Sequence, residues 1–195
     1  MAPSRPARVG SIRGVMPRHA AVHVDLDAVS HNVAALRAHV APAELCVVVK
    51  ADGYGHGAED VAAVALDAGA DRLAVALVEE GQELRDMGID APILLLSQPP
   101  ADAMADALAA GLTITVDTAA GIDAAAAAAS AAAAAAHAWP GLAGDGQGWS
   151  VHLKVDTGMH RVGCAPHEAV GLALRVLERG LALDGTFTHL AVADE

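Results

Sequence analysis

Short runs of apolar residues alternate with helical stretches along most of this chain, and this alternation constrains the fold more than any other feature. Runs that are apolar throughout predict strands buried on both faces, which indicates a parallel sheet covered by helices. The predicted strands lie at residues 22–26, 45–49, 72–77, 93–97, 112–116, 151–155 and 186–190.

Helices are predicted between these strands by apolar residues at three- and four-residue spacing. In the first of them Val29, Val33 and Leu36 recur in this way, while Gly69 and Gly88 are typical stop signals for later ones. The predicted helices cover residues 26–40, 58–68, 79–87, 101–110, 118–137 and 168–178.

The number of repeats indicates an α/β fold built as an incomplete (β/α)8 barrel of the TIM type. A complete barrel typically needs about 250 residues, whereas this chain has 195 and contains about six β/α units after residue 45. A doubly wound open sheet is the alternative, weakened because no Gly-x-Gly-x-x-Gly turn follows the first strand. We expect a disordered leader at 1–19, with Met16 as an alternative start, and a barrel domain at 20–195. That domain includes an Ala-rich helix and a Gly/Pro loop at 124–150.

Composition excludes several classes of function. The net charge of −12 argues against nucleic acid as a partner, and no apolar run is long enough to span a membrane. Cys46 and Cys164 stand far apart and predict two reduced thiols, as is usual in the cytoplasm. No metal site is expected, since the sequence contains neither His-Glu-x-x-His nor Cys-x-x-Cys.

A lysine at the end of a buried strand is the first candidate functional residue. Lys50 lies in the segment Val-Val-Val-Lys-Ala-Asp-Gly-Tyr-Gly-His-Gly, residues 47–57. In parallel α/β barrels the carboxyl ends of the strands face the active site, and a neutral lysine amine there can form a Schiff base with an aldehyde cofactor. A surface lysine before an ordinary glycine turn is the alternative.

Two later segments have a similar strand-and-turn pattern. Residues 151–163 read Val-His-Leu-Lys-Val-Asp-Thr-Gly-Met-His-Arg-Val-Gly and contain Lys154 and Arg161. The guanidinium of Arg161 suits a carboxylate ligand, or else forms a surface salt bridge. Residues 186–195 read Thr-Phe-Thr-His-Leu-Ala-Val-Ala-Asp-Glu, in which His189 is by itself an ordinary core histidine.

Together the three segments resemble the N-terminal part of alanine racemases, a family of fold-type III pyridoxal-phosphate enzymes. The family's lysine motif reads Val-x-Lys-Ala-Asp-Ala/Gly-Tyr-Gly-His-Gly, and its second motif reads Leu-Lys-Val-Asp-Thr-Gly-Met-x-Arg-x-Gly. Its third motif reads Thr-His-Phe/Leu-x-x-Ala-Asp-Glu. Weaker similarity at residues 24–36 and 79–94 extends the resemblance over roughly residues 20 to 195.

The resemblance implies a role for each of five residues. Lys50 would be the catalytic lysine that binds pyridoxal 5′-phosphate and moves the α-proton on one face of the substrate. Tyr54 would contact the cofactor phosphate, and His189 would lie beside the pyridine ring. Arg161 would bind the substrate carboxylate near the phenolic oxygen of the cofactor. Lys154 matches a lysine that is carbamylated in some members and holds that arginine in place.

The resemblance also implies a cytoplasmic, homodimeric isomerase that supplies D-alanine for cell-wall peptidoglycan. In the family a tyrosine from a C-terminal β-domain of the other subunit is the second base. This sequence has one tyrosine, Tyr54, and no such domain, so we expect a fragment that is inactive alone. The alternatives are a single-domain pyridoxal-phosphate carrier, a decarboxylase or D-amino-acid lyase of the same fold, and a truncated gene product. The carrier and the other enzymes have lysine motifs that differ after the lysine.

Overall fold

The computed structural model describes residues 22–138 and 149–193, and most of the predicted elements are present. The strands are β1 (Cys46–Val48), β2 (Arg72–Val75), β3 (Ile93–Leu95), β4 (Ile114–Val116), β5 (Ser150–Lys154) and β6 (Ala182–Phe187). The helices are α1 (Leu26–Val40), α2 (Lys50–Gly55), α3 (Ala58–Asp67), α4 (Val78–Asp86), η1 (Ala101–Ala103), α5 (Met104–Ala109), α6 (Ala119–Ala138) and α7 (Ala169–Glu178).

All the paired strands are parallel and follow one another in sequence order. They form two three-stranded sheets, β1-β2-β3 and β4-β5-β6. A bridge between Leu94 and Thr113 joins the two sheets, and the Thr113 amide donates to the carbonyl of Ile93 at 2.8 Å. Sequential order is the barrel arrangement, whereas a doubly wound sheet reverses its order. Within the described residues β1 and β6 each pair on one side only, so barrel closure is not seen.

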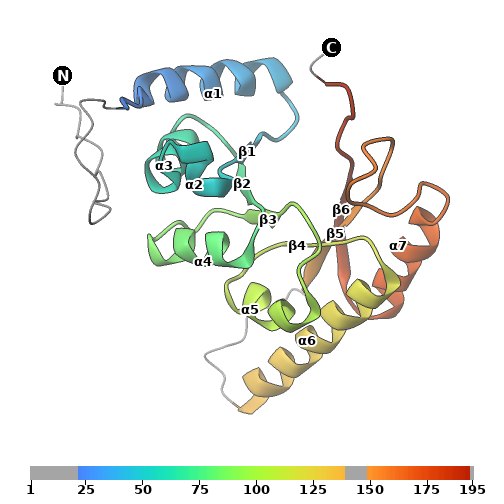
Figure 1. Cartoon of the computed structure of the whole chain (residues 1–195). Coiled ribbons are helices and arrows are strands. Elements are labelled where there is room, and N and C mark those ends of the chain that lie inside the picture. The colour runs from blue at the N-terminus through green and yellow to red at the C-terminus, as the bar shows by residue number, and fades with distance from the viewer. Residues whose placement is uncertain (1–21, 139–148, 194–195) are drawn as a thin grey trace, which may run out of the picture.

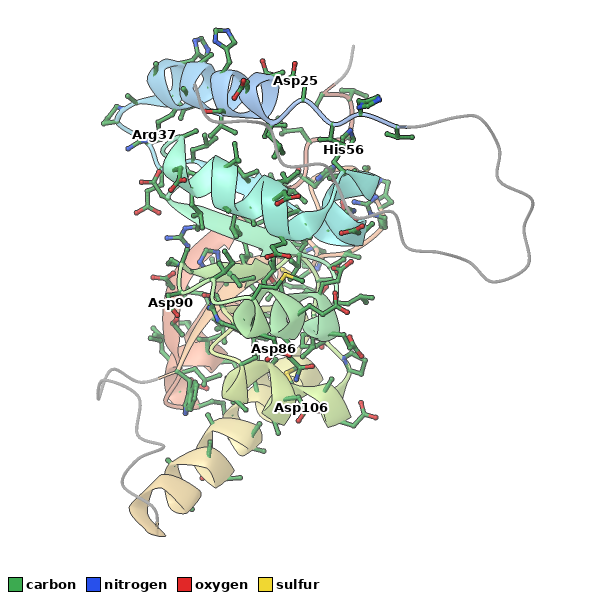
Figure 2. The ribbon with its side chains drawn as sticks, turned by 90° about the vertical axis from the view of Figure 1, so that its left-hand side faces the viewer. Asp25, Arg37, His56, Asp86, Asp90 and Asp106 are labelled. Atoms are coloured by element: carbon green, nitrogen blue, oxygen red, sulfur yellow. The ribbon has the colours of Figure 1, made fainter. Side chains whose placement is uncertain are left out.

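The helices lie on the outer side of the strands. In Figure 1, α3, α4, α5, α6 and α7 succeed one another around the strands. Figure 2 views the molecule from the side and shows α1, α3, α4 and α5 stacked in that order, with Arg37, Asp86 and Asp106 marking α1, α4 and α5. This is the layering of a βα barrel, with helices on the outer face of the sheet, and α1 packs on α3 rather than on the strands.

The main core lies between the strands and these helices. Leu73, Ile93, Ile114 and Val151 are all fully buried, and they represent β2 to β5. Because side chains alternate along a strand, the residue next to each of these in its own strand faces the other way, toward the concave side of the sheet. The largest buried side chains are Leu73, Leu84, Ile93, Leu95, Met104, Ile114, Ile122 and Leu153, with Val49, Val75, Val116 and Val151.

A polar cluster joins strands that are far apart in the sheet. Arg72 on β2 lies 3.7 Å from the carboxylate of Asp184 on β6, and His152 on β5 lies 3.0 Å from the same carboxylate. Arg72 also forms an ion pair of 2.7 Å with Glu44. The sheet is therefore curled enough to bring β2 and β6 within reach of each other.

Two predicted strands are wrong in position. Residues 22–25 are not a strand: Asp25 accepts a hydrogen bond of 3.0 Å from the Ala28 amide and caps α1 instead. The last strand was predicted at 186–190 but lies at Ala182–Phe187, where its register shifts beside β5. Gly185 makes room for this pairing, since a Cβ there would lie 2.7 Å from the ring of His152.

The cysteines and the longest helices were also covered by the sequence predictions, and two predicted segments lie outside the described residues. Cys46 and Cys164 are both free thiols, and burial raises the pKa of each. Among the described residues no helix is both long and apolar enough to cross a membrane. The expected leader at 1–19 lies outside the described residues, as does the Gly/Pro loop between 139 and 148.

Candidate active site

The candidate site is built on residues at the ends of the strands or shortly after them. Lys50 comes two residues after β1, Gln98 follows β3, and Asp117 follows β4 directly. Lys154 is the last residue of β5. Parallel strands end on the same side of the sheet, so these polar side chains gather at one end of the partial barrel.

Lys50 begins a turn with an unusual backbone conformation. The four residues after it, Ala51 to Tyr54, all have φ between 51° and 60°, which forms a left-handed helical turn. Such a conformation costs a residue other than glycine roughly 1–2 kcal/mol, and only Gly53 avoids that cost. Val49, directly before Lys50, is buried, and the amide of Gly53 donates to its carbonyl at 2.9 Å.

Two side chains hold this turn, one from the turn itself and one from α4. The Asp52 carboxylate accepts the amide of Ala58 at 2.7 Å and so ties the turn to α3. Glu80 on α4 accepts the amide of Ala51 at 2.7 Å. Burial works to raise the pKa of Glu80, but its backbone hydrogen bonds and nearby Lys50 outweigh burial and lower that pKa.

Tyr54 ends the left-handed stretch with an exposed side chain. Its ring centroid lies 5.8 Å from the Nζ atom of Lys50, within the range of a cation–π contact. The turn therefore places an amine and a phenol beside each other, with 60% of Tyr54 open to solvent.

Lys154 is a buried cation, with only 4% of the residue exposed. Its Nζ donates to the carbonyl of Leu96 at 2.8 Å and lies 5.2 Å from the centroid of the Phe187 ring. Burial lowers the pKa of Lys154, and the positive charges of Arg161 and Lys50 lower it further. Asp117 acts in the opposite direction.

Arg161 lies on the loop that follows β5. It is exposed and makes no hydrogen bond or ion pair with other described residues. The loop is fixed nearby: the amide of Gly163 donates to Asp117 at 3.1 Å, and Asp156 accepts the amide of His160 at 3.0 Å. Burial raises the pKa of Asp117, although the hydrogen bond from the Gly163 amide and the charge of Lys154 act to lower it. An open depression of about 410 Å³ is lined by Asp117, Thr118, Asp156 and residues 160–163.

Gln98 and Asp117 belong to this end of the barrel but were not predicted from the sequence. The Gln98 side-chain oxygen accepts the amides of Asp117 and Thr118 at 3.1 and 3.2 Å. It fits there because Gly121 has no Cβ, which would lie 1.9 Å from that oxygen. The rule that polar residues after buried strands face the site would have selected both.

The sequence predicts that His189 lies within the last strand, but in the structure it lies outside any strand. It follows the end of β6 at Phe187 and is exposed, without a hydrogen bond or ion pair among the described residues. The neighbouring Thr188 is held by a hydrogen bond of 2.7 Å between its hydroxyl and that of Thr157. The structure thus links Lys154 electrostatically to Lys50 and Arg161 and places Tyr54 beside Lys50, while no interaction of His189 with these residues is recorded in the described part of the chain.

Fold and site together define a partial α/β barrel with a lysine-bearing, cationic site at the carboxyl ends of its strands. The chain matches the family model described as alanine racemase, N-terminal domain, over residues 24–195, and it belongs to that family. Members of this family use pyridoxal 5′-phosphate.

Three relatives illustrate the similarity. The alanine racemase of Desulforamulus reducens is 46% identical over 179 residues, which cover 88% of this chain and 44% of that protein. A crystal structure of alanine racemase from Streptomyces lavendulae matches with a TM-score of 0.74 and 35% identity, covering 88% and 43%. A histidine racemase from Leuconostoc mesenteroides matches with a TM-score of 0.72 and 30% identity, covering 87% and 42%. This chain therefore spans less than half the length of these relatives.

Proposed function

We propose that this chain forms the N-terminal part of a pyridoxal-phosphate-dependent alanine racemase, an isomerase that interconverts L- and D-alanine. The position of Lys50 carries the proposal. This lysine follows strand β1 and the buried Val49 at the end of the sheet where barrel active sites lie, and a tightly held turn fixes its backbone. Membership of the alanine racemase family supports this reading.

The side chains present fit the cofactor chemically. Lys50 offers a half-buried amine for the aldehyde, and Lys154 and Arg161 bring positive charge to a site that must receive phosphate and carboxylate groups. When bound, pyridoxal phosphate withdraws electrons from the α-carbon of an attached amino acid and so makes its α-proton acidic. The protein's task is then to hold the cofactor, to orient the substrate and to remove the α-proton.

Each predicted residue has a proposed task in that chemistry. Lys50 holds the cofactor and moves a proton at the substrate α-carbon on one face. Arg161, which has no carboxylate partner among the described residues, binds the substrate carboxylate with its planar fork. Tyr54 contacts the cofactor phosphate, His189 lies beside the ring, and Lys154 positions Arg161.

Racemisation needs a second base on the opposite face of the α-carbon. Tyr54 is already assigned to the phosphate, so we propose that a tyrosine from a C-terminal domain of the other subunit in a homodimer supplies this base. Such an enzyme would act in the cytoplasm and provide D-alanine for the synthesis of peptidoglycan. The similar histidine racemase makes histidine the second amino acid to test as a substrate.

The test uses the complete gene product, including any sequence that follows Glu195. Pyridoxal phosphate should produce the visible absorption of an imine, and borohydride should fix the cofactor on Lys50, as peptide mapping would establish. Lys50→Ala should abolish both signals. An adduct on Lys154, the other lysine in this chain, would disprove the assignment of Lys50.

A second measurement separates a racemase from a carrier protein of the same fold. L-alanine incubated in D₂O with the loaded protein should acquire deuterium at the α-carbon and yield D-alanine. A protein that binds the cofactor on Lys50 but exchanges no α-proton would be a carrier, which would refute the proposed activity.

A further inference from the structure

Glu80 connects three segments beside the turn that carries Lys50, although no sequence motif assigns it a role. One carboxylate oxygen accepts the amide of Ala51, directly after Lys50, at 2.7 Å. The other oxygen accepts the amides of Ala76 and Leu77 at 2.8 and 3.0 Å. Glu80 thus ties the end of β2 and the start of α4 to the turn that carries Lys50.

The turn needs such support because its backbone conformation is unfavourable by itself. Ala51, Asp52 and Tyr54 carry Cβ atoms in left-handed geometry, which side chains disfavour. Asp52 secures the far end of the turn through the Ala58 amide. Glu80 secures the near end, one residue from the lysine.

The ionised form of Glu80 suits this task better than a neutral amide would. Both oxygens accept hydrogen bonds, whereas a glutamine has one oxygen and one NH₂ group. Glu80 also lies within electrostatic range of Lys50, and the net effect of its surroundings is a lowered pKa. The Glu80 carboxylate therefore acts on Lys50 in two ways. It holds the neighbouring Ala51 amide by a hydrogen bond, and its negative charge interacts with the lysine.

We propose that Glu80 is a positioning residue that clamps the left-handed turn and so fixes the place and the charge environment of the Lys50 amine. This inference rests on the proposed role of Lys50. Glu80 itself touches neither the cofactor nor the substrate in this proposal.

The substitution Glu80→Gln tests the clamp without removing the helix cap. Its single oxygen can still accept the amides of Ala76 and Leu77, as glutamine does in capping boxes, but its NH₂ group then faces the amide of Ala51. Glu79→Gln is the matched control, because Glu79 is exposed on the same first turn of α4.

Amide hydrogen exchange, measured on the complete gene product without cofactor, gives the first readout. In Glu80→Gln we expect exchange across residues 51–57 to be about fivefold faster, as the loss of one hydrogen bond implies. Exchange in the rest of α4 should remain as in the parent, and Glu79→Gln should change neither. Unchanged exchange in the turn would overturn the proposal, as would an equal acceleration in α4, which would make Glu80 only a helix cap.

The second readout is the pH profile of Lys50 labelling by pyridoxal phosphate followed by borohydride. Among the described residues, Lys154, Glu80 and Tyr54 are the charged or titratable side chains with a recorded contact or electrostatic interaction with Lys50. Removing the negative charge of Glu80 should move the profile to lower pH, and Glu79→Gln should move it less. An identical profile in Glu80→Gln would overturn the electrostatic part. If Lys50 is never labelled in the parent, the proposed function fails, while the exchange experiment still decides the clamp.

Discussion

The side chain of Lys154 reaches across the sheet from β5 to the main-chain carbonyl of Leu96, just beyond β3, and donates a hydrogen bond of 2.8 Å. Strand β4 lies between the two in the sheet order. One buried lysine therefore connects the two three-stranded sheets at the end where the candidate site lies. Its amine is shielded from solvent and close to Arg161, which lowers its pKa.

The first prediction concerns carbamylation of Lys154. Only a neutral amine reacts with CO₂, and a lysine pKa below 10.5 increases the neutral fraction at a given pH. The resulting carbamate would be an anion beside Arg161 and would keep one N–H for the Leu96 carbonyl. We expect native mass spectrometry in bicarbonate to detect one added CO₂ on Lys154, lost on acidification. An unmodified lysine under these conditions would contradict the prediction.

The lowered pKa of Lys154 also predicts a dependence of stability on pH. Between the folded pKa and 10.5 the unfolded chain binds more protons than the folded one, so the free energy of unfolding should rise with pH in that window. Urea titrations at a series of alkaline pH values would measure this slope. In Lys154→Met the slope should be smaller than in the parent. A slope equal to that of the parent would show that other groups cause the pH dependence.

Replacement of Arg161 should affect turnover much more than folding. The residue is exposed and without a hydrogen-bond partner among the described residues, so Arg161→Ala should change stability by no more than about 0.5 kcal/mol. Loss of a charge-assisted contact to the substrate, worth about 1.5–3 kcal/mol, should reduce kcat/KM roughly 10- to 150-fold. Arg161→Lys keeps the charge but not the fork, so its activity should lie between the two. Full activity in Arg161→Ala would show that Arg161 is a surface residue that does not bind the substrate.

Two glycine-to-alanine substitutions should have opposite effects on stability. Gly163 has a φ of +129°, and a Cβ there would lie 2.6 Å from the nitrogen of Asp156. Gly163→Ala should therefore destabilise the protein by about 1–3 kcal/mol. Gly171 lies inside α7 with nothing near its absent Cβ, and Gly171→Ala should stabilise by about 0.5–1 kcal/mol. Denaturant midpoints would test the pair, and equal signs would contradict the structure.

The last prediction concerns acid stability of the contact between α6 and α7. Asp123 accepts hydrogen bonds from Arg175 and Arg179, which lower its pKa from 3.8 to about 2. Because the folded pKa is the lower one, the contribution is complete above 3.8 and is lost as the pH falls through about 2. Melting temperatures of Asp123→Asn should therefore fall less than those of the parent over this range. Parallel curves would exclude Asp123 as a source of acid sensitivity.

The buried strands and their helices could be predicted from the sequence because their signals are local. Mostly apolar runs marked β1 to β5 to within two residues. The predicted strand at 22–26 failed because Asp25 caps a helix, which a short apolar run does not reveal. The position of β6 failed because its register depends on the contact of Gly185 with His152, a residue far away in the sequence.

The candidate site was predictable in part for the same reason. Lys50, Lys154 and Arg161 lie in continuous motifs, whereas the residues that hold them come from elsewhere in the chain. The left-handed turn could not be expected from Ala, Asp and Tyr, because these residues disfavour that conformation. Asp52 and Glu80 hold it, and the contribution of Glu80 depends on where α4 packs against the turn.

The contact between Arg72 and Asp184 bears on the order in which such a fold can be assembled. Four strand spacings separate β2 from β6, which would be about 19 Å in a flat sheet, yet the two side chains approach to 3.7 Å. The bend is thus already present in these six strands and does not have to be imposed by a segment that completes the ring. Any such segment would meet a preformed arc, and this arc would serve as the template for its docking.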